Sequence, residues 1–81
     1  AKSLPKPEYP AEAKLNRDGG AVSIQVVIDE KGNVIRAGAV NGARTLQYPA
    51  RDAACGAKFE PTLLQGSPIM VTGTVTYNFV P

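Results

Sequence analysis

Few side chains in this sequence could carry out chemistry. Asp29 and Glu30 are adjacent carboxylates, and Cys55 is the single thiol. Two neighbouring carboxylates can bind a metal ion or transfer protons, but no third ligand lies close to this pair in the sequence, which favours solvated turn residues. The chain contains no His to activate a thiol or to complete a metal site. The sequence therefore predicts a binding module that is not an enzyme and has no metal or cofactor.

Cys55 and a glycine pair have structural interpretations. A single Cys cannot form an internal disulfide, so we expect Cys55 to be a small, buried, apolar residue. Gly19-Gly20 lacks the spacing of phosphate-binding loops and is expected to end a helix.

Length and charge restrict the class of protein. With 81 residues the chain is one small domain with a thin core. A net charge of +2 is too small to indicate nucleic acid or anionic membrane as a partner. No apolar run approaches the roughly 20 residues of a membrane helix, and no secretory signal is present.

Because the chain starts with Ala, we expect a fragment or a processed chain. Residues 1–8, rich in Lys and Pro, predict the end of an extended linker, and 9–81 the domain.

The clearest structural signal is the alternation of residues over 69–80, between Pro68 and Pro81. This pattern is typical of a half-buried strand. One expected face is apolar and includes Gly73: Ile69, Val71, Val75, Tyr77 and Phe79. The opposite face carries Met70, Thr72, Thr74, Thr76, Asn78 and Val80.

Two further strands are expected over 21–29 and 33–41. The first alternates cleanly, and the second does so poorly, which a sheet edge or a bulge would explain. The segment between them predicts a hairpin turn with Gly32 in the left-handed conformation.

Two helices complete the pattern. One is expected over 11–17, anchored on the core by Tyr9 and Leu15. The other is expected over 46–58, with Thr45 as N-cap and a stripe of Ala facing the sheet. Phe59 would fix the end of this second helix, and its replacement by Ala would cost about 3–5 kcal/mol. Residues 60–67 are expected to form a loop.

These elements predict an α+β fold. A hairpin, a helix and a returning strand give a three-stranded antiparallel sheet of order 2-1-3, because crossovers are right-handed. Both helices cover one face of this sheet. The last strand then lies at an edge, and the other face is open.

The ordered set of residues resembles the C-terminal domain of TonB, the periplasmic energy transducer of bacteria with outer membranes. The residues that carry the resemblance are Tyr9-Pro10, Ala13, Gly20, Val22, Ile28-Asp29, Gly32-Asn33-Val34, Val40, Ala53-Ala54, Phe59, Pro61, Gly66, Pro68, Tyr77 and Phe79. Family members often have a Val and a Trp where this chain has Cys55 and Ala57, and Pro49 and Gly56 are also less usual. These departures concern the packing of the second helix.

The resemblance implies a mechanism of binding. The domain would capture an extended segment of an outer-membrane receptor, the TonB box, by adding it as a strand, and an inner-membrane proton-channel complex would act through regions outside these residues. The resemblance places the domain in the periplasm and the parent protein in the inner membrane. The expected partner-binding residues lie along the edge strand: Met70, Val71, Thr72, Thr74 and Thr76.

Two other functions fit the expected sheet. The same edge could form a homodimer or join an assembly of the cell envelope. An RNA-binding sheet has a similar architecture, but it needs aromatic residues on its open face, and the expected open face has none.

Overall fold

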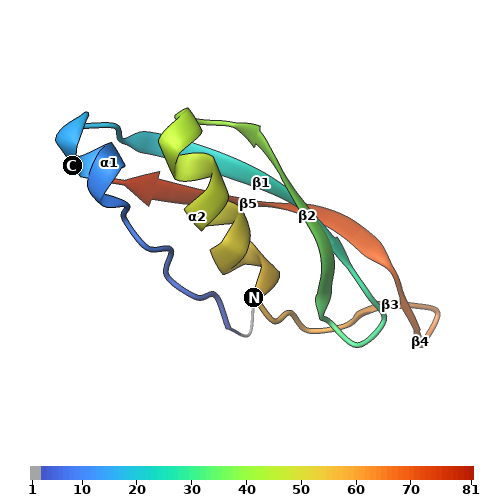
Figure 1. The fold of residues 1–81 in the computed structure, drawn as a ribbon. Coiled ribbons are helices and arrows are strands. Elements are labelled where there is room, and N and C mark those ends of the chain that lie inside the picture. The colour runs from blue at the N-terminus through green and yellow to red at the C-terminus, as the bar shows by residue number, and fades with distance from the viewer. Residues whose placement is uncertain (1–2) are drawn as a thin grey trace.

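The computed structural model describes residues 3–81 and has an α+β architecture (Figure 1). Its elements are α1 (Ala11–Leu15), β1 (Gly20–Ile28), β2 (Val34–Asn41), α2 (Arg44–Cys55), β3 (Thr62–Leu64), β4 (Ser67–Ile69) and β5 (Val71–Phe79). The main sheet has the order β2-β1-β5, with β1 antiparallel to both neighbours, and the helices cover one face. The predicted fold class, strand order and helix placement are confirmed. Within residues 3–81, no helix combines the length and apolar character needed to cross a membrane.

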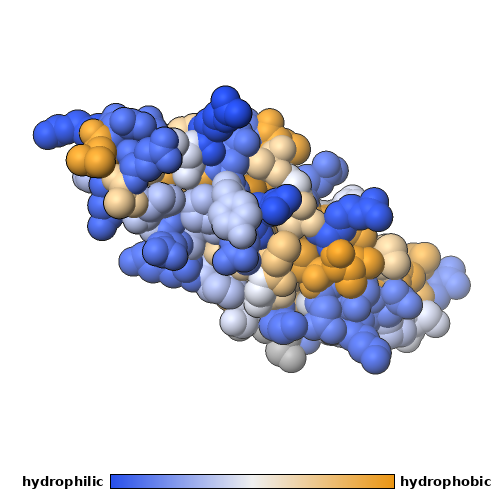
Figure 2. All heavy atoms as spheres, in the orientation of Figure 1, coloured by the Kyte–Doolittle hydropathy of each residue, from blue (hydrophilic) through white to orange (hydrophobic). Residues whose placement is uncertain are grey.

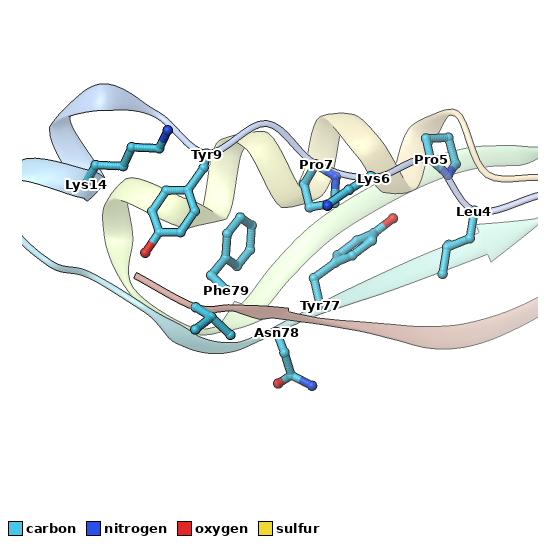
Figure 3. Close-up of a pocket in the computed structure, with 10 residues that line it drawn as sticks. Leu4, Pro5, Lys6, Pro7, Tyr9, Lys14, Tyr77, Asn78 and Phe79 are labelled. Atoms are coloured by element: carbon cyan, nitrogen blue, oxygen red, sulfur yellow. The ribbon is translucent and has the colours of Figure 1, made fainter.

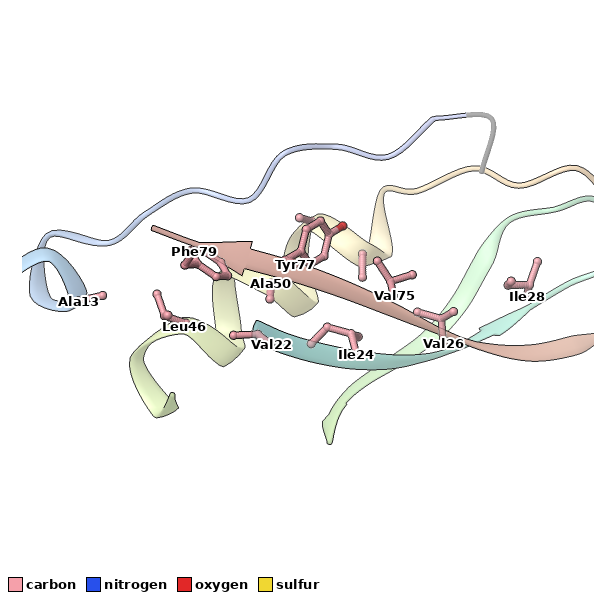
Figure 4. Packing of buried hydrophobic residues seen from close by; sticks show 12 residues of the cluster. Ala13, Val22, Ile24, Val26, Ile28, Leu46, Ala50, Val75, Tyr77 and Phe79 are labelled. Carbon is pink, nitrogen blue, oxygen red and sulfur yellow. The ribbon is translucent and has the colours of Figure 1, made fainter. Parts of the chain in front are cut away.

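The core lies between the helices and the inner face of β1 and β5 (Figure 4). Its members are Ala13, Val22, Ile24, Val26, Ile28, Leu46, Ala50, Ala53, Ala54, Val75, Tyr77 and Phe79. Most helix residues in this set are Ala, whose small side chains let a helix approach a sheet closely. The larger side chains of the strands then fill the space between the layers.

The two pairings of β1 differ in regularity. Its register with β5 is unbroken from Gly20 opposite Phe79 to Ile28 opposite Val71. Its register with β2 shifts twice, and the shifts leave Ile35 and Val40 without a partner on β1. These two irregularities explain the poor alternation that predicted an edge or a bulge in this strand.

The β1–β2 turn is built on a carboxylate. Asp29 Oδ1 accepts hydrogen bonds from the amides of Lys31 at 2.9 Å and Asn33 at 2.8 Å. Gly32 has φ of 88°, as predicted for the left-handed position. The Asp29 carboxylate thus stabilises the turn by accepting hydrogen bonds from the backbone amides of Lys31 and Asn33.

The first helix is shorter than predicted. It ends at Leu15, because Arg17 turns to a φ of 55° two residues later. Leu15 is 84% exposed, so its expected role as a core anchor is wrong. Tyr9, the other expected anchor, packs against the core.

The second helix begins and ends earlier than predicted. Its N-cap position is Ala43, and the hydroxyl of Thr45 instead donates to Asp18 Oδ2 at 2.6 Å. The helix ends at Cys55 and Gly56 occupies the C-cap, so the expected continuation to residue 58 is wrong. Cys55 is exposed, which also corrects its expected burial.

The segment before β5 is a small hairpin that the sequence did not predict. Thr62 pairs with Ile69 and Leu64 with Ser67 across a turn at Gln65 and Gly66, whose φ values are 52° and 84°. Positive φ at both central positions suits the twist of a two-residue hairpin turn. The expected loop over 60–67 and the continuous strand over 69–80 are therefore wrong: Ile69 belongs to β4, and β5 begins at Val71.

Residues 3–8, called the strap below, run extended along α2 and β5 (Figures 1 and 4). The strap begins at Ser3, whose amide and carbonyl pair with Lys58 at 3.1 and 2.8 Å. It leads into α1 through Tyr9, whose ring meets Phe79 edge to face at 5.5 Å between centroids. The first two residues of the expected linker, Ala1 and Lys2, lie outside the described residues.

Candidate functional site

The hydrogen bonds of β1 fix the direction of its backbone amides. The amide of Ser23 donates to Asn41 Oδ1 at 3.0 Å, and the amide of Asp29 donates to the carbonyl of Asn33 at 2.9 Å. Odd-numbered residues at this strand therefore direct their amides toward β2. Since backbone groups alternate in direction along a strand, the even-numbered residues of β1 face β5.

This alternation identifies the free backbone groups of β5. Val71, Gly73, Val75, Tyr77 and Phe79 lie opposite even-numbered residues of β1, so their amides and carbonyls belong to the β1–β5 ladder. The residues between them direct their amides and carbonyls away from β1: Thr72, Thr74, Thr76 and Asn78. The free side of β5 thus offers a regular row of donors and acceptors.

The predicted partner-binding residues occupy three different settings. Thr72, Thr74 and Thr76 are exposed and have outward backbone groups. Val71 has its backbone in the ladder with β1 and a half-buried side chain against the core. Met70 lies between β4 and β5 and is 54% exposed.

The open face of the sheet is polar around these threonines. Ser23 and Thr76 lie opposite each other, and their hydroxyls are 3.1 Å apart. The solvent-facing side chains within β5 are three Thr and one Asn, with no aromatic ring among them. This face therefore lacks the stacking surface that single-stranded RNA recognition uses.

The two edges of the sheet differ as templates for another strand. β2 is interrupted by two register shifts and carries the charged Arg36. β5 has nine residues with neither a Pro nor a charged side chain, and its register is unbroken. Bulges, charges and prolines are the features that protect edges from pairing, so β5 is the better template.

A groove lies beside the C-terminal half of β5, under the strap (Figure 3). Its volume is about 660 Å³, and it is lined by Leu4, Pro5, Lys6, Pro7, Tyr9, Lys14, Tyr77, Asn78, Phe79 and Val80. Tyr9, which also contributes to this groove, donates its hydroxyl to the carbonyl of Asp18. The groove was missed from the sequence because the strap was expected to be linker, although Leu4 among its polar residues was a usable signal.

One polar atom beside this groove is unsatisfied. The hydroxyl of Tyr77 is buried and has no hydrogen-bond partner among the described residues. Its burial raises the pKa of Tyr77 above the ordinary value of 10.0. Tyr77 as a whole residue is only 7% exposed and belongs to the core.

The described residues offer backbone hydrogen bonds and apolar contacts at this edge. Residues 3–81 contain no group of three or more His, Cys, Asp or Glu side chains that could hold a metal ion. The exposed Cys55 is the last residue of α2 and does not belong to β5 or to the lining of the groove. Chemically, the arrangement is suited to binding an extended chain.

Comparison with known proteins agrees with this description. The family model of the Gram-negative bacterial TonB protein C-terminal region matches residues 5–81. No curated protein matches the sequence. The fold is similar to the solution NMR structure of the Pseudomonas aeruginosa TonB C-terminal domain, with a TM-score of 0.71 and 22% sequence identity. That match covers 95% of this chain and 80% of the other. The chain therefore belongs to the family of Gram-negative bacterial TonB C-terminal domains, which are periplasmic protein-interaction modules of transport energy transducers and act with outer-membrane receptors.

Proposed function

We propose that this domain captures the TonB-box segment of an outer-membrane receptor by adding it as a strand to β5. The observation that carries the proposal is the regular edge, where Thr72, Thr74 and Thr76 present outward backbone groups without an interrupting bulge or charge. In strand addition, backbone hydrogen bonds supply affinity and alternate side chains supply specificity. The free edge and the groove beside it have the arrangement that this mode of recognition needs.

The proposed capture suits the transmission of force. Backbone hydrogen bonds along one edge are loaded together when the captured segment is pulled, so they share the load. In this proposal the parent protein is anchored in the inner membrane, and a proton-channel complex there supplies the force through regions outside these residues. A linker before the domain would allow it to reach across the periplasm.

The mechanism is tested by removing one outward amide. Thr72→Pro deletes a donor on the free side and places a ring where the new strand would lie. We expect this variant to stay folded and to lose binding of a fluorescein-labelled TonB-box peptide. Thr74→Ala keeps the backbone intact and should weaken binding by no more than about 1 kcal/mol.

Circular dichroism provides the folding control for this titration. Strand addition at β5 is the wrong mechanism if Thr72→Pro stays folded and binds the peptide as tightly as the parent chain. A second control is Thr45→Ala, which alters a hydroxyl on α2 away from the edge and should leave binding unchanged.

The same edge supports a second candidate function, which is self-assembly. A long edge without charges or Pro is a template for any strand, including β5 of another copy. Sedimentation velocity over a range of concentrations would reveal such a homodimer. If the edge serves assembly, Thr72→Pro should abolish the dimer while receptor-derived peptides show no binding to the parent chain.

A further inference from the structure

We propose that the groove beside β5 recognises an acidic side chain of the captured segment, which binds the hydroxyl of Tyr77 and the ammonium group of Lys6. The proposal rests on strand addition at β5 and assigns to that site a preference for a carboxylate. Three observations support it: the position of the groove, the unpaired hydroxyl and the charge of the lining residues.

The groove lies where a side chain of an added strand would point. Directly opposed residues of neighbouring strands place their side chains on the same face of a sheet. Tyr77 and Phe79 face the helices, so a residue added opposite either one also faces the helices. It would then project into the space between β5 and the strap, shown in Figure 3.

The hydroxyl of Tyr77 supplies a hydrogen-bond donor for such a side chain. Figure 3 shows the hydroxyl directed toward the strap, and it has no partner among the described residues. A buried donor without a partner is costly, and an entering carboxylate would satisfy it. A hydrogen bond to an ionised acceptor is also stronger than one between neutral groups.

The strap is held by contacts at both of its ends, which leaves its middle free to shift. Ser3 is held by two backbone hydrogen bonds to Lys58, and Tyr9 is held by its ring contact and its hydroxyl. Between them, residues 4–8 form no hydrogen bond with any other described residue. The strap also has hollows on both sides, one toward β5 and one toward α2. A small displacement of its middle would open access to Tyr77 without breaking a hydrogen bond.

The charge of the groove selects the class of side chain. Lys6 and Lys14 are among the residues that line it, and no Asp or Glu is. Lys6 belongs to the strap, toward which the Tyr77 hydroxyl is directed, whereas Lys14 lies at the other end of the groove beside Tyr9. The buried donor of Tyr77 and the cation of Lys6 are complementary to a carboxylate. Lys14 adds to the positive potential of the groove from a greater distance.

The probe is a set of fluorescein-labelled peptides of alternating Thr and Val, with one Glu moved through every position. Each Glu peptide is paired with a matched Gln peptide of the same length. At one position we expect the Glu peptide to bind about tenfold more tightly than its Gln partner at low salt. This ratio should fall toward one in high salt, because salt screens the lysine charges.

Substitutions in the groove should change the ratio of Glu-peptide to Gln-peptide affinity without changing the affinity for the Gln peptide. Tyr77→Phe and Lys6→Gln are each expected to reduce the Glu preference at least about threefold and to leave the affinity of the Gln peptide unchanged, and Lys14→Gln should reduce the preference less. Lys31→Gln is the matched control, because Lys31 lies in the β1–β2 turn. A merely structural role of Tyr77 would weaken both peptides equally.

The results also separate this proposal from strand addition. Equal binding of the Glu and Gln peptides at every position would overturn the groove proposal, as would a Glu preference that survives both Tyr77→Phe and Lys6→Gln. Thr72→Pro should abolish binding of both peptides; if both still bind this variant, strand addition fails instead.

A shorter probe covers the case in which no long peptide binds. Acetyl-Val-Glu-Val-amide is too short to be held as a strand, and its Gln analogue is the control. Shifts in the NMR signals of Tyr77 and Lys6 with the Glu peptide alone would support the groove proposal. The absence of such shifts would overturn it.

Discussion

Gly32 and Phe59 are in direct contact across the β1–β2 turn. The amide of Phe59 donates to the carbonyl of Gly32 at 2.9 Å, and a Cβ atom added at Gly32 would lie 1.9 Å from the carbonyl oxygen of Phe59. The contact joins the chain that follows α2 to the hairpin of β1 and β2. It requires a residue that has no side chain and that accepts a positive φ.

Gly32→Ala is therefore expected to destabilise the fold by at least about 2 kcal/mol, through backbone strain and the clash together. Gly66→Ala is the matched control, because Gly66 has φ of 84° but open space around it. It should lose only the roughly 1 kcal/mol of backbone strain. Denaturant unfolding of the two variants measures the difference, and equal losses would show that the contact with Phe59 is unimportant.

Proline substitutions on β5 test the assigned direction of its amides. Gly73→Pro removes an amide from the ladder with β1 and should cost at least about 2 kcal/mol. Thr72→Pro removes an outward amide and should cost no more than about 1 kcal/mol. The free energy of unfolding, measured by urea titration, distinguishes them. A reversed order would mean that the amides of β5 point the other way.

The two Phe residues should differ in their contribution to stability. Phe79 is 5% exposed and packs on Tyr9, so Phe79→Ala should cost about 3–5 kcal/mol. Phe59 is only partly buried, which corrects the loss of about 3–5 kcal/mol expected from the sequence: Phe59→Ala should cost about 2–3 kcal/mol, less than a fully buried ring. Thermal and denaturant unfolding would measure both values, and a larger loss at Phe59 would contradict this order.

Tyr77 should make the fold sensitive to alkaline pH. Its pKa is raised in the folded state, so the unfolded chain releases this proton first. Stability should therefore fall as the pH rises through the ordinary tyrosine value of 10.0. Tyr77→Phe should therefore reduce this loss. Unfolding curves between about pH 8 and pH 11 measure the effect; identical pH dependence in Tyr77→Phe and the parent chain would contradict it.

Cys55 should react in the folded protein. Its side chain is exposed on α2, so a thiol reagent should modify it at the same rate under native conditions and in denaturant, apart from small effects of local charge. Cys55→Ser should change the free energy of unfolding by less than about 0.5 kcal/mol, as surface substitutions usually do. Protection of the thiol in the native state would contradict the exposure.

The sequence predicted the elements that have one buried face. Apolar and polar side chains alternate along β1 and β5 because every second side chain packs against the helices. This alternation was visible in the sequence. The hairpin of β3 and β4 was missed because all three residues of Thr62–Leu64 are exposed, which leaves no alternation. Its remaining signal was Gln65-Gly66, a turn pair whose first residue adopts a positive φ that Gln rarely takes.

Other features depended on contacts that local patterns do not encode. The outward direction of the backbone amides of Thr72, Thr74 and Thr76 follows from the register of β5 with β1. A shift of one residue in this register would reverse it. The groove forms between the strap and the C-terminal end of β5, so it brings together the two ends of the described chain. The exposure of Cys55, in contrast, was predictable, because it lies outside the helical stripe of Leu46, Ala50, Ala53 and Ala54.

The pairing of β1 with β5 has a consequence for the order of folding. Gly20 lies opposite Phe79, so the central strand of the sheet gains its second neighbour only from residues near the other end of the sequence. Contacts of such separation lower the folding rate, because a long loop must close before they form. A growing chain that lacks β5 would expose the inner side chains of β1 together with an unpaired strand edge. Such an intermediate is prone to aggregation, so a nascent chain of this protein would benefit from a chaperone until β5 has been made.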